Sequence, residues 1–212
     1  LDVNYAPVGG ANNQVETLLV EPDGRTVIGG HFTWVNGVGR NYLARLNTDG
    51  SLDGSFELPF GGFNSVVYTV VRQGDGKFLV GGAFTLANGV SRNRIARLNN
   101  DGSLDTGFNP GTGADGAVWA VAVQADGKVV IGGDFLQING VNRSRIARLN
   151  NDGSLDTSFN PGTGADGSVR AVAVQVDGRV VIGGGFTLIN GVSRNYIARL
   201  TATGGLDAGF NV

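Results

Sequence analysis

The chain has 212 residues, of which 41% are hydrophobic and 16% are charged, a balance typical of one or two folded domains rather than of disorder. Its formal net charge of -2 argues against broad electrostatic binding to nucleic acid or to acidic membranes. With no Cys and one His, the composition excludes disulfides, thiolate metal sites and multi-histidine metal sites. No apolar run approaches the ~18 residues of a membrane helix, so no membrane partner is expected.

The most informative feature is an internal repeat. A Gly-Gly pair occurs at residues 29–30, 81–82, 132–133 and 183–184, at steps of 52, 51 and 51 residues. Leu-Asp and Ala-Arg-Leu recur with similar steps. The chain therefore divides into repeats 1–51, 52–103, 104–154 and 155–205 and a partial repeat 206–212, within a single domain spanning 1–212. A period near 50 residues with several short strands favours a β-propeller over a helical solenoid.

All the predicted elements in a repeat are strands, and the third repeat shows them most clearly. Residues 117–124 alternate and are rich in Val, residues 128–135 end in the Gly pair, and residues 145–150 and 155–159 complete the unit. Asp-Gly dipeptides indicate hairpins, and Asn139-Gly140 is interpreted as the start of a polar loop. The prediction is an all-β propeller of four-stranded antiparallel blades, one blade for each repeat of about 51 residues.

The Gly pair predicts close packing, because a strand ends in glycine where a neighbouring backbone or blade leaves no room for a side chain. Apolar strands such as residues 129–131 are expected to bury both faces between adjacent blades. The mode of closure stays open. Four blades make a small closed ring, half of a larger ring built by two chains, or an excerpt of a longer array.

The third and fourth repeats carry Ser-Leu-Asp-Thr-x-Phe-Asn-Pro-Gly-Thr-Gly, followed by Ala-Val-Gln-x-Asp-Gly, Ile-Gly-Gly-x-Phe, Asn-Gly-Val-x-Arg and Ile-Ala-Arg-Leu. Over essentially the whole chain this pattern resembles the delta-60 repeat family of bacterial β-propeller proteins, and its Gly pair is also similar to the kelch unit. The first repeat departs most, because it lacks the Gly-Thr-Gly loop. The resemblance implies an extracellular or cell-surface bacterial protein and no defined chemistry.

Two glycine-rich loops, residues 111–116 and 162–167, match G-x-G-x-x-G. A Val-rich strand follows each loop, in place of the helix whose N-terminus would bind a pyrophosphate, so both are interpreted as inter-blade loops. The sequence carries no nucleophile elbow and no repeated catalytic triad. It predicts no cofactor, no metal and no enzymatic activity.

A repeated arginine precedes a turn whose oxygen-bearing residues are spaced like those of a calcium loop. These arginines are Arg45, Arg97, Arg148 and Arg199. Each stands where the first carboxylate of such a loop would be, and calcium needs about 6–8 oxygens. We therefore expect each guanidinium to replace the metal and to hold the aspartate of the following Leu-Asp by bidentate bonds. A second series either rings an anion site or positions a loop: Arg40, Arg92, Arg143 and Arg194.

Positions at which the four repeats differ predict the functional site, because shared positions serve the blade. One such position lies early in the first strand, and another directly follows the Gly pair. The candidate ligand-binding residues are Glu16, Tyr68, Trp119 and Arg170 at the first position, His31 and Asp134 at the second, and Trp34 nearby. If the first strand is innermost, these side chains either line the mouth of the channel, where they suit a sugar or a peptide, or plug it.

The predicted function is a non-catalytic extracellular module that binds a glycan or protein ligand at the channel face. Two alternatives stay open. The first is a structural repeat or oligomer building block of a bacterial surface protein, which would self-associate through its blades or end strands. The second is a carbohydrate-active hydrolase or lyase that uses Glu16 and Asp134 as paired carboxylates.

Overall fold

The computed structural model describes residues 9–211, and the regular structure of these residues is β apart from one short 3-10 turn, η1 (Pro59–Gly61). Each repeat forms a three-stranded antiparallel sheet with its second strand in the middle. The first strands are β1 (Val15–Val20), β6 (Val67–Arg72), β11 (Val118–Val123) and β16 (Val169–Val174). The second strands are β2 (Thr26–Gly30), β7 (Phe78–Gly82), β12 (Val129–Gly133) and β17 (Val180–Gly184). The third strands are β5 (Leu43–Leu46), β10 (Ile95–Leu98), β15 (Ile146–Leu149) and β20 (Ile197–Leu200).

The fourth segment of each blade pairs with the third strand through one antiparallel bridge. These bridges are Leu46–Leu52, Leu98–Leu104, Leu149–Leu155 and Leu200–Leu206. The predicted antiparallel propeller blades are therefore confirmed, with an outer strand reduced to a single bridge. Because Leu52 pairs with the strand that precedes it, the structural blades are offset from the repeat boundaries chosen in the sequence.

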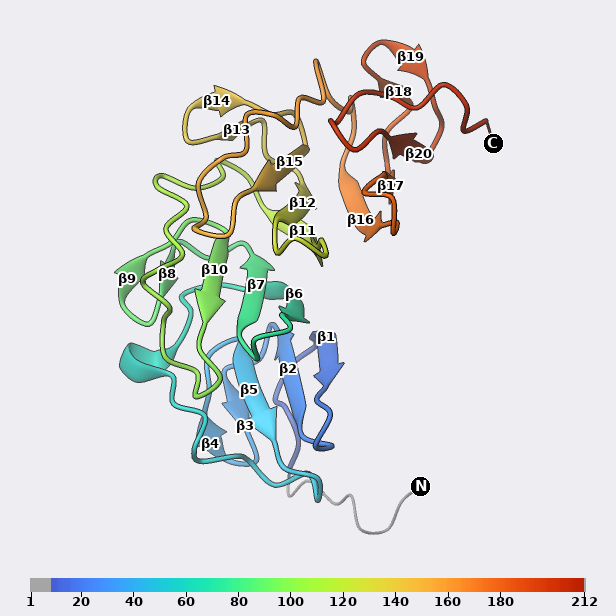
Figure 1. The fold of residues 1–212 in the computed structure, drawn as a ribbon. Helices are drawn as coiled ribbons and strands as arrows, with labels where there is room; N and C mark the ends of the chain where they lie inside the picture. Colours follow the sequence, from blue (N-terminus) through green and yellow to red (C-terminus); the bar gives the residue numbers. More distant parts are fainter. Residues whose placement is uncertain (1–8, 212) are drawn as a thin grey trace.

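Each repeat also forms a short hairpin on the outer side of its blade (Figure 1). The hairpins pair β3 (Trp34–Val35) with β4 (Val38–Gly39), β8 (Leu86–Ala87) with β9 (Val90–Ser91), β13 (Gln137–Ile138) with β14 (Val141–Asn142), and β18 (Leu188–Ile189) with β19 (Val192–Ser193). The turn residues Asn139 and Gly140 have φ values of 53° and 73°, as the type I′ turn of a two-residue hairpin requires. The prediction of a polar loop at this position is therefore wrong.

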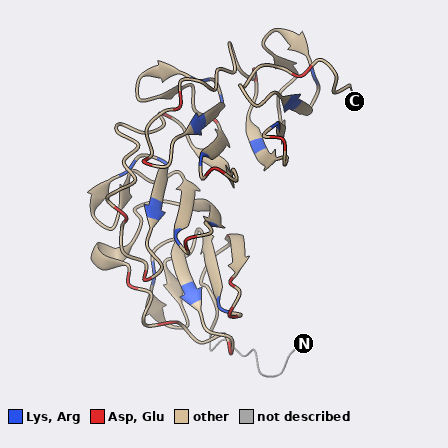
Figure 2. Ribbon diagram, viewed as in Figure 1, with Lys and Arg blue, Asp and Glu red and all other residues tan. Residues whose placement is uncertain are grey.

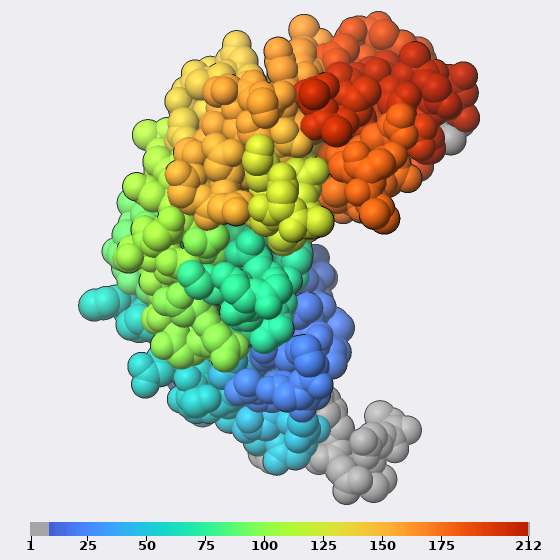
Figure 3. Space-filling model, in the orientation of Figure 1, coloured from blue at the N-terminus to red at the C-terminus, as the bar shows by residue number. Residues whose placement is uncertain are grey.

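The four blades follow one another along an open arc (Figures 1 and 3). The first strands line the concave side of the arc, as expected from the sequence (Figure 1). The first and last blades lie at opposite ends of the arc, so the four blades do not close a ring of their own (Figure 3). Half of a larger ring and an excerpt of a longer array are the alternatives that fit this shape. No helix among residues 9–211 is long and apolar enough to span a membrane.

Three of the four hydrophobic clusters lie between neighbouring blades, and the fourth lies within the first blade. Val27 and Leu43 of the first blade pack in one cluster with Phe78 and Phe84 of the second blade. Equivalent clusters join the second blade to the third and the third blade to the fourth. All of residues 129–131 are buried, which confirms that the middle strand of a blade covers both of its faces with neighbours. Neighbouring blades therefore bury apolar side chains against each other at every internal interface.

The Gly pair permits this close packing. A Cβ added to Gly132 would lie 2.6 Å from a methyl group of Val169, which opens the first strand of the next blade. The same distance is 2.6 Å for Gly29 and Val67, and 2.8 Å for Gly81 and Val118. The second glycine lies against its own blade, where a Cβ at Gly133 would collide with the carbonyl oxygen of Ala117. The predicted close approach of both a blade and a backbone is thus confirmed.

An arginine on each third strand holds the outer segment of its blade (Figure 2). The guanidinium Nε donates to one aspartate oxygen at 2.7–2.8 Å in the pairs Arg45–Asp53, Arg97–Asp105, Arg148–Asp156 and Arg199–Asp207. Each guanidinium also lies 4.7–4.9 Å from the ring centroid of a phenylalanine on the same segment. The predicted contact between this arginine and the aspartate of the outer segment, which we call the latch, is confirmed. Its bond to the carboxylate is single rather than bidentate.

The same arginines also connect consecutive blades. Nη1 donates at 2.8 Å to a backbone carbonyl of the following blade in the pairs Arg45–Asn100, Arg97–Asn151 and Arg148–Ala202. One guanidinium therefore satisfies a carboxylate of its own blade and a carbonyl of the next. The second arginine series behaves differently, because each member donates to the carbonyl of the residue before it, at 2.7–3.0 Å. This series positions the ends of the outer hairpins and does not converge on one anion site.

The latch predicts a large loss of stability when its carboxylate is neutralised. Asp105→Asn should lower the free energy of unfolding by about 3 kcal/mol, because Arg97 and Lys77 both lose a charged partner at a largely buried position. Urea denaturation measures this change. Asp101→Asn removes an exposed turn carboxylate that accepts from Ser103, and should change the free energy by less than about 0.5 kcal/mol. Equal effects of the two substitutions would contradict the latch.

The latch carboxylates also predict how stability depends on pH. Burial alone would raise the pKa of Asp105, but hydrogen bonds from Lys77 and Arg97 outweigh it and lower the pKa from 3.8 to about 2. A carboxyl group with a lowered folded-state pKa contributes its full stabilisation above the unfolded-state pKa and loses it as the pH falls through the folded-state pKa. The melting temperature should therefore fall between about pH 4 and pH 2. Thermal unfolding of Asp105→Asn should show a smaller fall, and an equal fall would refute the assignment.

Candidate ligand-binding site on the concave face

A β-bulge at the start of every first strand places one extra side chain on the concave side. In each blade the pairing with the second strand shifts register around one residue. These bulge residues are Glu16, Tyr68, Trp119 and Arg170. They are the four candidates that the sequence places early in the first strand. A bulge residue is left out of the regular ladder, so its side chain can vary without changing the sheet.

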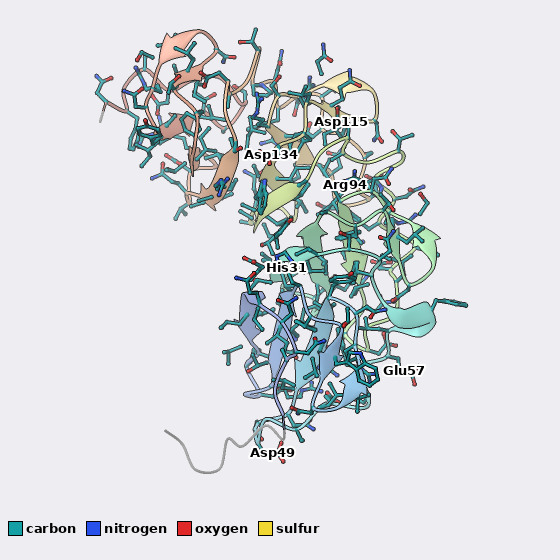
Figure 4. The ribbon with its side chains drawn as sticks, turned by 180° about the vertical axis from the view of Figure 1, so that it is seen from behind. His31, Asp49, Glu57, Arg94, Asp115 and Asp134 are labelled. Atoms are coloured by element: carbon teal, nitrogen blue, oxygen red, sulfur yellow. The ribbon has the colours of Figure 1, made fainter. Side chains whose placement is uncertain are left out.

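The second variable position is held beside the bulge by one backbone hydrogen bond. The N–H of His31 donates to the carbonyl of Gln14 at 2.8 Å, and that of Asp134 to the carbonyl of Ala117 at 2.9 Å. Both acceptors directly precede a first strand, so the residue after the Gly pair lies next to the bulge of its own blade. Figure 4 shows His31 and Asp134 on the inner side of the arc and Glu57 on its outer side.

Six of the seven candidate side chains form one continuous array across the four blades. In the first blade Glu16 Oε1 lies 3.1 Å from His31 Nε2, and the His31 ring meets the Tyr68 ring edge-on at 6.3 Å between centroids. Tyr68 stacks on Trp119 with 3.9 Å between centroids, and the Arg170 guanidinium lies 5.4 Å from the Trp119 centroid. We call Glu16, His31, Tyr68, Trp119, Asp134 and Arg170 the concave array.

Asp134 connects the third blade of this array to the fourth. Its Oδ2 accepts a hydrogen bond from Trp119 Nε1 at 2.7 Å, and its Oδ1 accepts one from the hydroxyl of Ser168. Ser168 precedes a first strand and was not predicted from the sequence, although the residue at this position also differs between repeats. Glu16 and Asp134 have different hydrogen-bonding partners, and the charges of both act on the Tyr68 hydroxyl.

The electrostatics of the array favour hydrogen bonding to a polar ligand. Burial raises the pKa of the Tyr68 hydroxyl, and the negative charges of Glu16 and Asp134 raise it further. The phenol therefore keeps its proton at neutral pH and serves as a donor. Glu16, Asp134 and Arg170 are exposed, and Tyr68 and Trp119 are half-buried. The concave array thus offers two acceptors, two kinds of donor and partly open aromatic edges.

Trp34 is not part of the concave array. It lies exposed on β3, in the outer hairpin of the first blade, where its N–H donates to the side chain of Asn12. Its predicted position at the channel mouth is wrong, because buried Phe32 anchors the chain after His31 and the hairpin then turns to the outer side. The signal for this hairpin is the Asn36-Gly37 dipeptide, the counterpart of Asn139-Gly140, which was interpreted as the start of a polar loop.

Clefts occur at the opposite ends of the first strands. Two clefts, of about 500 and about 470 Å³, lie among the hairpin turns near residues 124–127. No residue of the concave array lines either cleft. All four of these turns share an Asp-Gly dipeptide, whereas the two array positions share no residue between blades, so we place the candidate site on the array.

The glycine-rich loops join neighbouring blades. Asn93 of the second blade donates to the carbonyl of Thr112 at 2.7 Å, and Arg145 of the third blade donates to the carbonyl of Ala165 at 2.7 Å. Strands β11 and β16 follow these loops, so neither loop opens a helix. The interpretation of both G-x-G-x-x-G matches as inter-blade loops is confirmed.

Comparison with known families identifies the repeat. A family model described as "Domain of unknown function (DUF5122) beta-propeller" matches residues 21–56, 73–108, 124–159 and 175–210. The chain belongs to this family. Each DUF5122 match ends at the phenylalanine beneath a latch arginine, which confirms the repeat as the unit of a propeller. The finer resemblance to delta-60 and kelch units is not part of this match. No curated protein sequence matches the chain.

Several solved structures share the DUF5122 chain's fold at low sequence identity. A virginiamycin B lyase from Staphylococcus aureus matches 92% of this chain and 56% of its own, with 18% identity and a TM-score of 0.58. A gluconolactonase from Xanthomonas campestris matches 91% of this chain and 60% of its own, with 18% identity and a TM-score of 0.56. PorZ, a surface component of the type-IX secretion system of Porphyromonas gingivalis, matches 98% of this chain and 28% of its own, with 12% identity and a TM-score of 0.53. This chain therefore spans less than two thirds of the length of each.

These comparisons correct one prediction. The sequence predicted no enzymatic activity, but two of the three proteins described above are enzymes, a lyase and a gluconolactonase. The fold of the DUF5122 chain therefore gives no ground for excluding catalysis, and that prediction is withdrawn. The third protein is a bacterial surface component, so propellers of this shape also occur at the cell surface.

Proposed function

We propose that this DUF5122 β-propeller is an extracellular binding module that holds a glycan on its concave array. The observation that carries the proposal is that the variable side chains contact one another. Six side chains from positions that vary between blades lie in one connected row across all four blades. Variable residues scattered over the surface would argue for drift, whereas a connected row is expected where blades share one ligand.

The chemistry of the row suits a carbohydrate. The Glu16 and Asp134 carboxylates accept hydrogen bonds from sugar hydroxyls, and the Arg170 guanidinium and the Tyr68 phenol donate to sugar oxygens. Tyr68 and Trp119 stack on each other, so their exposed edges supply van der Waals contact to the C–H groups of a sugar. The similarity to a surface component of another bacterium supports the extracellular location.

The competing interpretation is that these side chains only plug the channel. They do satisfy one another in part, since Trp119 Nε1 donates to Asp134 and Arg170 lies over the same ring. Three of the charged members, Glu16, Asp134 and Arg170, nevertheless remain exposed. A side chain that served only as a plug would be buried by its neighbours, so the exposed charges favour ligand binding.

A glycan array probed with the purified chain tests the proposal. Trp119→Ala and Tyr68→Ala should each abolish glycan retention, because each removes one ring of the stacked pair. The free energy of unfolding should fall by only about 1 kcal/mol, since both rings are partly exposed. Trp34→Ala is the matched control: it deletes an exposed tryptophan of the outer hairpin and should retain the glycan. Retention of no glycan, or of peptides only, contradicts the proposal, as does equal loss in the control.

A second candidate function is hydrolysis or elimination on the bound carbohydrate. It is favoured by the 3.1 Å contact between Glu16 Oε1 and His31 Nε2, since an imidazole beside a carboxylate is a suitable general acid or base. Glu16→Gln and His31→Ala should then stop the release of product while the glycan is still retained. Chromatography of the glycan after incubation measures this. Product release that survives both substitutions rules out a catalytic role for the pair.

A further inference from the structure

The two ends of the arc carry the two halves of the interface that joins blades inside the chain. We propose that the fourth blade of one copy binds the first blade of a second copy, and that two copies joined in this way at both seams form a ring of eight blades. This inference concerns assembly and is independent of the proposed ligand. Its basis is that the three internal interfaces show which surface each end requires.

The first observation concerns the valine that packs on a glycine of the preceding blade. At the ends of the described arc, both the valine and the glycine lack this contact. At the internal interfaces Val67, Val118 and Val169 are fully buried against a glycine of the preceding blade. The equivalent Val15 is 43% exposed at the start of the arc. At the other end, a Cβ on Gly183 would meet only atoms of its own blade, with the nearest at 3.7 Å. Gly183 therefore has room for a valine of a following blade, and Val15 is the side chain at the matching repeat position.

Further apolar positions at the two ends show the same contrast. Leu18 is 66% exposed, whereas Val70 and Val121 at the same repeat position are buried. Ile197 is 38% exposed, whereas Ile95 and Ile146 are buried. The apolar surface left open at each end is thus the surface that a neighbouring blade covers elsewhere in this chain.

Among the described residues, the latch arginine of the last blade also lacks a hydrogen bond that the other three latch arginines make to the following blade. Arg199 bonds Asp207 and lies over Phe210 as in the other blades. Its Nη1, however, donates to no carbonyl of a following blade within residues 9–211, in contrast to the three internal latches. The repeat spacing identifies the missing acceptor as the carbonyl of residue 48 in the next blade. In the pair of copies, Arg199 would donate to Thr48 of the second copy.

The bulge residues at the two ends of the arc, Arg170 and Glu16, carry opposite charges. Consecutive bulge residues contact each other at two of the three internal interfaces, Tyr68 with Trp119 and Trp119 with Arg170, and at the first interface His31 lies between Glu16 and Tyr68. After Arg170 the next bulge residue in the ring would be Glu16 of the second copy. An exposed cation therefore meets a carboxylate at the seam, and the concave array becomes continuous around the ring.

The size of the ring follows from the number of blades. Head-to-tail contacts between identical chains either close into a ring or extend into a fibre. Two copies supply eight blades, which is the upper end of the usual range of about 4–8, whereas three copies would exceed it.

Size-exclusion chromatography with light scattering on the 212-residue chain tests the assembly. The expected mass is twice the 21.8 kDa of one chain. Gly183→Val should give a monomer, because the new side chain occupies the space into which Val15 of the second copy would pack. The monomer should stay folded by circular dichroism, since Gly183 has no neighbour closer than 3.7 Å to its Cβ position. Val176→Asp is the control: it changes an exposed apolar turn residue whose counterpart Ala125 is exposed at an internal interface, so the dimer should persist.

A charge exchange tests the orientation of the two copies. Arg170→Glu should weaken dimerisation by about tenfold or more, because like charges then meet at the seam. Adding Glu16→Arg to that variant should restore the dimer. A wild-type chain that is monomeric at every concentration, masses above the dimer, or a dimeric Gly183→Val variant would each overturn the proposal.

Discussion

The contact between a valine and the glycine of the preceding blade is the interaction on which this structure depends. No blade can bury both faces of its middle strand alone, because a three-stranded sheet with one outer bridge leaves its apolar side chains open. A glycine at the end of the second strand lets the next sheet approach closely enough to cover them. Stability is then a sum over neighbouring blades, as in other repeat proteins.

Apolar packing alone would not determine how one blade is oriented on the next. The arginine of each third strand adds that direction, because its guanidinium joins an aspartate of its own blade to a carbonyl of the following one. Such a group is satisfied only when both blades and both outer segments are in place. Specific geometry therefore comes from a few directed polar bonds laid over a core of simple shape.

Much of this architecture could be predicted from the sequence because its signals are local. The Gly pairs, the Asp-Gly turns and the latch arginines each recur at a fixed step, and differences between repeats were enough to find Tyr68 and Trp119. The bulges were hidden, since one extra residue hardly disturbs a run of alternating small apolar side chains. Trp34 was misplaced because the Asn-Gly hairpin beside it was interpreted as a loop. The open arc depends on the angle between adjacent sheets, which no short pattern encodes.

The bulge has a consequence for how such a propeller can evolve. A residue outside the ladder can be exchanged without altering the register, so one codon per blade changes the surface chemistry while the scaffold stays the same. Duplicating a blade copies that adaptable position along with its support. On the proposed function, selection for a new ligand acts on Tyr68 and Trp119 in the middle of the arc. On the proposed assembly, Glu16 and Arg170 at its two ends are selected instead for the fit between two copies.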